Sequence, residues 1–287
     1  VFAAFPGDLD VACILVEAIM NRTPWNMWDQ KTGDVAEGAG TVEAQVVLET
    51  MLDQNPDSWS HPGLLHLYVH LMEMSPTPEK ALKAGDVLRK LVPDAGHLIH
   101  MPTHIDVQCG HYQDVLHWNW KATQVDRKAL DSMGVYNLYT GYRIHNYHFA
   151  VYGAMFLGQY EPAMRMAQEL AEVTPEELLR VESPPFATFF ESYFALKVHV
   201  MIRFGRWKEI IEEPLPEDRL LWANLTATLH YAKGVAHAAI GEVPNAETEK
   251  TKFLTARDVM PKDRRLHNVL CIDQLAVAEA MLEGEIE

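Results

Sequence analysis

The stretch HPGLLHLYVHLME, residues 61–73, has the spacing of an amphipathic helix that begins with a proline. Its apolar residues recur at steps of three and four, and Pro62 fits the first turn of a helix. The segments LDVACILVEAIMN (9–21) and EKALKAGDVLRKLV (79–92) have the same period. Because alternating, strand-like runs are scarce in this chain, the sequence predicts an all-α fold.

A turn motif divides the helical segments into hairpins. It reads GHYQDVL from residue 110, GQYEPAM from 158, GRWKEII from 205 and, more weakly, GEVPNAE from 241. These turns resemble the turn inside a tetratricopeptide (TPR) hairpin, although only the last of the three separations, 36 residues, approaches the usual period of about 34 residues. We therefore expect a single domain over 1–287, an α-solenoid of irregular TPR-like hairpins. Its first helices are expected near 9–21, 61–73, 95–109, 138–157, 185–204 and 219–240.

The segment 22–40 interrupts this pattern. It contains Trp25 and Trp28, followed by glycines and acidic residues that do not continue a helix. A loop longer than a solenoid needs is often a lid or a binding loop. We expect one of these roles, or else that the two tryptophans close the end of the core.

Histidines form pairs on successive predicted first helices. His66 and His70 are four residues apart, and His100 and His104 repeat this spacing 34 residues later. Positions one period apart occupy equivalent places on the concave surface of a solenoid, so the four imidazoles are expected to face one groove. The segment GYRIHNYHF adds a third pair, and the predicted metal ligands are therefore His66, His70, His100, His104, His145 and His148.

The chemistry of this set suits a transition metal. Imidazole binds copper, iron and zinc, and the six ligands suffice for one or two ions. No cysteine joins the cluster, which argues against a closed structural zinc site and leaves an open coordination position. Glu73 follows His70 by one helical turn. We expect it to be a metal ligand, an acceptor for an imidazole N–H or a catalytic general base.

Pro102 lies between His100 and His104 and disfavours a continuous helix there. The helix is expected either to begin near Met101 or to kink, so the two histidine pairs would differ in geometry. His61 and His97 are expected at helix starts, with capping or supporting roles.

Composition argues against a nucleic-acid partner and a membrane-spanning segment, and it bears on the cellular location. A formal charge of −16 opposes binding to a nucleic-acid backbone, and the apolar runs are too short to span a membrane. No signal peptide is visible after Val1. The three cysteines are far apart and have no CxxC spacing, which favours a reducing, cytoplasmic location.

Long segments of the chain resemble a group of microbial TPR-repeat proteins of poorly defined function. The resemblance covers most of the chain and rests on segments including PWNMWD, HPGLLHLYVHLMEMSPTPEKAL, LVPDAGHLIHMPTHI and HNYHFAVYGAMFLGQYEPAM. It implies that the paired histidines belong to a family pattern, but it implies no activity. Members of the group extend beyond the segment matching AEAMLEGEIE, so we expect this chain to be a fragment, a natural short form or only the ordered portion of a longer protein.

Two main functions follow from these patterns. The first is a metalloenzyme, with an oxygen-using oxidoreductase favoured over a hydrolase, that acts on a small organic substrate in the groove. The substrate pocket is then expected to include Trp25, Trp28, Tyr68, Tyr142, Arg143 and Asn146. The second is a non-catalytic TPR scaffold that binds a peptide or protein partner. A histidine-rich surface whose binding responds to pH is a third possibility.

Overall fold

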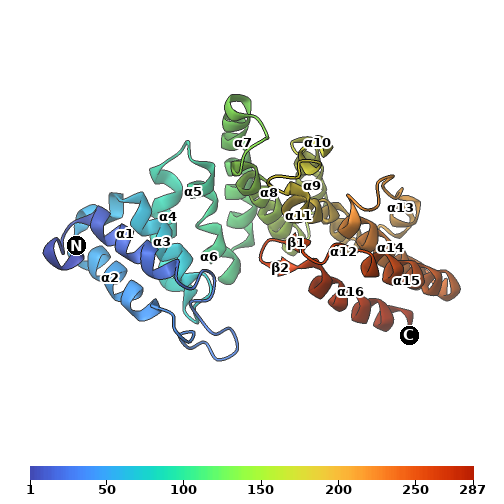
Figure 1. The fold of residues 1–287 in the computed structure, drawn as a ribbon, viewed down its shortest axis with the longest axis horizontal. Helices are drawn as coiled ribbons and strands as arrows, with labels where there is room; N and C mark the ends of the chain where they lie inside the picture. Colours follow the sequence, from blue (N-terminus) through green and yellow to red (C-terminus); the bar gives the residue numbers. More distant parts are fainter. The chain divides into compact units, whose positions relative to one another are not determined.

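The chain folds into two helical units. The computed structural model describes residues 1–287 and divides them into unit 1, Val1–Ala129, and unit 2, Leu130–Glu287 (Figure 1). The predicted all-α fold is confirmed, since the only strands are two residues long and pair as an antiparallel hairpin in unit 2. The α-solenoid arrangement and the single domain stay predictions.

Unit 1 contains most of the predicted histidine site. Its helices are η1 (Phe2–Ala4), α1 (Leu9–Met20), α2 (Thr41–Gln54), η2 (Pro56–Ser60), α3 (Pro62–Met72), η3 (Pro78–Ala81), α4 (Leu82–Leu91), α5 (Gly96–His100), α6 (Thr103–Gln108) and α7 (Tyr112–Met133), which crosses the unit boundary.

Helix α3 is the centre of the unit 1 core. Its apolar face buries Leu64, Leu65, Leu71 and Met72 completely, and it packs against α1, α2, α4 and α6. Helix α1 lies so close that a Cβ on Gly63 would be 2.7 Å from the Sγ atom of a cysteine on that helix. The remaining stripe of α3, which carries the histidines, is therefore held rigidly by its buried opposite face.

The loop between α1 and α2 is attached to the end of α3. The indole N–H of Trp28 donates to the carbonyl oxygen of Leu71 over 2.7 Å, and Thr41 Oγ1 donates to the carbonyl of Met27. Trp28 packs against the core, whereas the Trp25 side chain is 54% exposed. Trp28 therefore packs at the end of the core, and the lid or binding role of the loop stays a prediction.

The predicted break at Pro102 is confirmed. Helix α5 ends at His100 and α6 begins at Thr103, so His100 and His104 lie on two separate short helices. A Cβ on Gly85 of α4 would lie 3.0 Å from the Cβ of Pro102, which shows that α4 packs tightly against the break.

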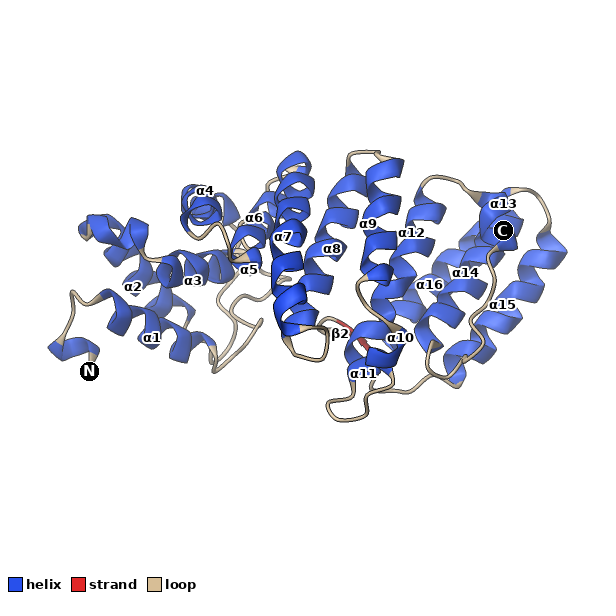
Figure 2. Cartoon of the chain, turned by 90° about the horizontal axis from the view of Figure 1, so that it is seen from above, coloured by secondary structure: helices blue, strands red, loops and turns tan.

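Unit 2 consists of further paired helices. They are α8 (Tyr139–Phe156), α9 (Tyr160–Glu172), α10 (Glu176–Leu179), α11 (Phe186–Phe190), η4 (Glu191–Ala195), α12 (Leu196–Arg203), α13 (Trp207–Glu212), α14 (Ala223–Ala239), α15 (Val243–Asp258) and α16 (Cys271–Ile286). Strands β1 (Arg265–Leu266) and β2 (Val269–Leu270) precede α16. Figure 2 shows α8, α9 and α12 side by side.

The predicted glycine turns join helices in both units. Gly110, Gly158, Gly205 and Gly241 all have positive φ, between 65° and 82°. This left-handed conformation ends the preceding helix, and a side chain there would be strained. None of the helices has the combination of length and hydropathy needed to cross a bilayer.

Candidate metal centre

Helix α3 places two imidazoles side by side. His66 and His70 have ring centroids 4.6 Å apart with their planes at 69°. Tyr68, between them in sequence, points elsewhere, because its hydroxyl donates to Glu49 Oε1 on α2 over 3.1 Å. The predicted pocket residue Tyr68 therefore does not lie beside the two histidines.

Helix α5 adds a third imidazole. The ring of His97 lies 5.2 Å from that of His66, and the ligand atoms of His66, His70 and His97 all lie within 4.8 Å of one another. The position of α5 depends on Gly96, where a Cβ would be 2.1 Å from Asp126 Oδ1 on α7. The absence of a side chain at Gly96 thus permits the close packing that brings His97 to α3.

The role of His97 differs from the one expected for it. It lies in the first turn of α5, as predicted, but its ring joins the ligand group instead of only supporting it. A signal was present in the sequence, because His97, His100 and His104 follow an i, i+3, i+7 pattern typical of one helix face.

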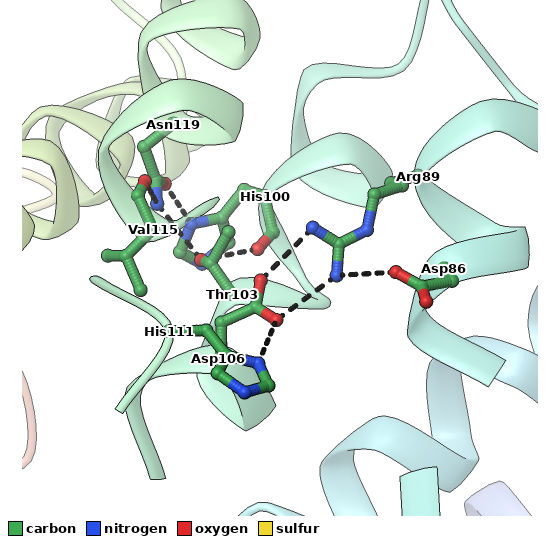
Figure 3. Close-up of polar contacts among 8 residues, drawn as sticks. All are labelled: Asp86, Arg89, His100, Thr103, Asp106, His111, Val115 and Asn119. Atoms are coloured by element: carbon green, nitrogen blue, oxygen red, sulfur yellow. Dashed lines mark hydrogen bonds and ion pairs between the residues drawn. The ribbon is translucent and has the colours of Figure 1, made fainter. Parts of the chain in front are cut away.

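The break between α5 and α6 brings His100 and His104 into direct contact. Their Nε2 atoms are 2.9 Å apart. His100 is fully buried, and its Nδ1 atom lies 2.6 Å from Asn119 Oδ1 on α7 (Figure 3). The two predicted histidine pairs therefore differ, because in this pair the two nitrogens face each other.

Glu73 connects the two sets of histidines. Its Oε1 atom lies 2.9 Å from His70 Nδ1, and its Oε2 atom lies 2.5 Å from His104 Nδ1. The carboxylate is 7% exposed, and both oxygens are engaged by imidazoles. This arrangement favours the acceptor role among the three considered for Glu73, because such contacts orient metal-binding imidazoles.

Burial keeps three of these imidazoles neutral. Desolvation, and then the neighbouring histidines, lower the pKa of His66 to about 3 and that of His97 to about 4. The same causes hold the pKa of His100 well below its ordinary value. Burial alone would raise the pKa of Glu73, but the contacts with His104 and His70 outweigh it and hold this pKa well below its usual range. The cluster thus offers neutral imidazoles, the form that binds metals, beside an ionised carboxylate.

One buried nitrogen of the cluster has no protein partner. His66 Nε2 is buried and makes no hydrogen bond. A buried polar atom without a partner costs about 1–3 kcal/mol and calls for an explanation.

A buried ion pair supports α6. Both guanidinium Nη atoms of Arg89 on α4 donate to Asp106, at 3.1 and 3.2 Å, and both side chains are at most 3% exposed (Figure 3). Asp106, His111 and Asp114 also bring three potential ligand atoms close together. Because both Asp106 oxygens are engaged by Arg89, we interpret this group as structural.

His61 has the helix-capping role expected for it. Its Nδ1 atom accepts a hydrogen bond from the backbone N–H of Leu64, and its Nε2 atom lies 3.1 Å from Asp10 Oδ1. It is therefore the N-cap of α3 and does not belong to the group of potential metal ligands.

The predicted ligands His145 and His148 belong to α8 in unit 2. Their rings are 5.8 Å apart, His145 stacks on His267, and His148 lies against Tyr193. The other four predicted ligands belong to unit 1, and a joint site of six histidines stays a prediction.

The remaining predicted pocket residues are divided between the units. Trp25 and Trp28 belong to unit 1, and Tyr142, Arg143 and Asn146 belong to α8. Tyr142 is 46% exposed, whereas the other two residues on α8 are buried. A shared substrate pocket stays a prediction.

Comparison of the chain with protein-family models gave no match, and comparisons with curated proteins and with solved structures gave no significant match. The resemblance to TPR-repeat proteins stays a prediction, and the function is argued from the site.

Proposed function

We propose that unit 1 binds a transition-metal ion through His66, His70 and His97. The observation that carries this proposal is the buried Nε2 atom of His66, which has no hydrogen-bond partner and belongs to a group of three imidazoles with ligand atoms within 4.8 Å. A bound cation would give this nitrogen a partner, and Glu73 supports the arrangement because it engages His70 Nδ1 and leaves Nε2 of that ring for a ligand bond.

The ligand set supports a catalytic role. Three neutral imidazoles without a thiolate suit copper, iron or zinc and leave at least one coordination position for another molecule. We therefore propose a metal-dependent enzyme, an oxidoreductase that uses oxygen on a small organic substrate if the ion is copper or iron. A zinc ion would instead support hydrolysis.

The test begins with the metal content of protein purified without a histidine tag. We expect near-stoichiometric copper, iron or zinc in the wild type, and loss of the ion in a folded His66→Ala/His97→Ala double variant. The control is His117→Gln, an exposed histidine of α7, which is expected to keep the ion. If the wild type takes up no ion even after incubation with each of the three metals, the proposal is wrong and a non-catalytic binding protein becomes the better interpretation.

The step from binding to catalysis needs a separate assay. The metal-loaded protein is incubated with oxygen and a panel of small reduced phenols, and oxygen uptake is recorded. Turnover that the double variant lacks supports an oxidoreductase. If the copper- or iron-loaded protein takes up no oxygen with any of these phenols, the proposal of a phenol-oxidising enzyme is wrong. The proposal of metal binding is unaffected by this result.

A further inference from the structure

The amide of Asn119 can have only one orientation. Its Nδ2 group donates to the carbonyl of Val115 over 2.8 Å and to Thr103 Oγ1 over 2.9 Å (Figure 3). A carbonyl only accepts, and Thr103 gives its own proton to the carbonyl of His100 over 2.6 Å. Both neighbours therefore require the nitrogen of the amide, and Oδ1 must face the imidazole of His100.

This orientation decides which nitrogen of His100 carries the proton. Asn119 Oδ1 is an acceptor, so the Nδ1 atom of His100, 2.6 Å away, must be the donor. Because the ring is fully buried, the neutral form of the imidazole is favoured. Its Nε2 atom therefore presents a lone pair, and this lone pair points at His104.

The contact with His104 must then contain a proton from the other ring. His104 Nε2 donates to His100 Nε2 over 2.9 Å, and His104 Nδ1 donates to the ionised carboxylate of Glu73 over 2.5 Å, so this ring carries both protons in the metal-free protein. The proton on Nε2 lies between two nitrogens that face each other. A cation that displaced this proton to the solvent would be bound by two neutral imidazoles.

We propose that His100 and His104 hold a second metal ion through their Nε2 atoms, in place of the proton between them. The proposal rests on the proposed function of His66, His70 and His97, because it adds a second ion to the same cluster. Two nitrogens at about 2.1 Å from one ion are about 3.0 Å apart at a right angle and about 3.4 Å apart at a tetrahedral angle. The observed separation of 2.9 Å is close to both values, so the two rings would have to move only slightly to admit an ion.

Glu73 connects the two proposed positions. One oxygen contacts Nδ1 of His70, from the first ligand set, and the other contacts Nδ1 of His104, from the second. The same carboxylate therefore orients one ligand of each ion.

Asn119 acts in this proposal as a positioning residue. It touches no ion, but it keeps the proton of His100 on Nδ1 and thus the lone pair on Nε2. Partners of this kind typically change metal affinity by about 10–100-fold when they are removed. Asn119→Leu removes the acceptor at similar size, whereas Asn119→Asp keeps an acceptor for His100.

The test uses cobalt(II) as the probe, with visible absorption and elemental analysis after gel filtration giving the stoichiometry. We expect two equivalents in the metal-free full chain. His104→Gln and His66→Ala/His97→Ala should each retain one equivalent, and His117→Gln should retain two. Asn119→Leu should weaken only the second equivalent, by tenfold or more, and Asn119→Asp, which keeps the acceptor for His100 but loses the donor to Val115 and Thr103, should weaken it less.

The outcomes separate the two proposals. The wild type could bind only one equivalent of cobalt. If that equivalent is lost in the double variant but kept in His104→Gln, the His100–His104 position is wrong and the site of His66, His70 and His97 is supported. If it is lost in His104→Gln but kept in the double variant, the site of His66, His70 and His97 is wrong. If Asn119→Leu does not fold, His104→Gln and Asn119→Asp still decide the question, and nitrogen-15 spectra of the histidines give an independent readout. A His100 ring protonated on Nε2 in the metal-free wild type would overturn the role of Asn119.

Discussion

Lowering the pH from 7 to 5 should destabilise metal-free unit 1 strongly, because its buried imidazoles resist protonation. The pKa is about 3 for His66 and about 4 for His97 in the folded protein, against about 6.5 in an unfolded chain. Between these values the unfolded state binds more protons than the folded state. Stability therefore rises with pH across this window and falls as the solution is acidified below pH 6.5.

The magnitude follows from the same values. At pH 5 each unfolded imidazole gains about 2 kcal/mol from protonation, while the folded rings remain almost entirely neutral. His66 and His97 together should therefore cost unit 1 about 4 kcal/mol between pH 7 and pH 5. His100, whose pKa is also lowered, acts in the same direction.

The assay is urea unfolding, followed by circular dichroism, in EDTA at pH 7, 6 and 5. His66→Gln should reduce the loss of stability on acidification by about 2 kcal/mol, because the variant has one protonatable ring fewer. The exposed His117→Gln is the matched control and should leave the loss unchanged. If His66→Gln lost as much stability as the wild type, the ring of His66 would not be neutral and buried, and the reasoning would fail.

Four further results are expected. His61→Ala should cost α3 about 1 kcal/mol in urea unfolding, because the helix loses its N-cap. Arg89→Met should cost about 3–5 kcal/mol, because Asp106 would remain buried with only His111, 3.9 Å away, beside it, and a cost below 1 kcal/mol would contradict this. Gly96→Ala should weaken metal uptake measured by titration, since its Cβ would collide with Asp126 and displace α5. A metal ion at 100 times its dissociation constant should stabilise unit 1 by about 2.7 kcal/mol in thermal unfolding, unless the unfolded chain binds it equally well.

Helix positions were largely readable from the sequence, because period, proline and glycine act locally. The six predicted first helices correspond to α1, α3, the α5–α6 pair, α8, the α11–α12 segment and α14. Pro102 predicted the break between α5 and α6 for a local steric reason. The hairpin of β1 and β2 was not predicted, since strands of two residues carry too little pattern.

The site was less predictable, because its contacts join residues distant in the chain. The pairs His66–His70 and His100–His104 were visible from their spacing. The role of Asn119 was not, since it depends on the packing of α7 against α5. The contact of Glu73 with His104 likewise depends on how α3 packs against α6, whereas its contact with His70 lies within one helical turn.

The hydrogen bond from Trp28 to Leu71 has a spectroscopic consequence. The indole is hydrogen-bonded to the residue that follows His70, so its fluorescence emission should change when the environment at the end of α3 changes. A paramagnetic ion at the cluster would quench this fluorophore more than a distant one. In a chain whose other six tryptophans were replaced by phenylalanine, Trp28 would provide an optical reporter of the histidines without any added label.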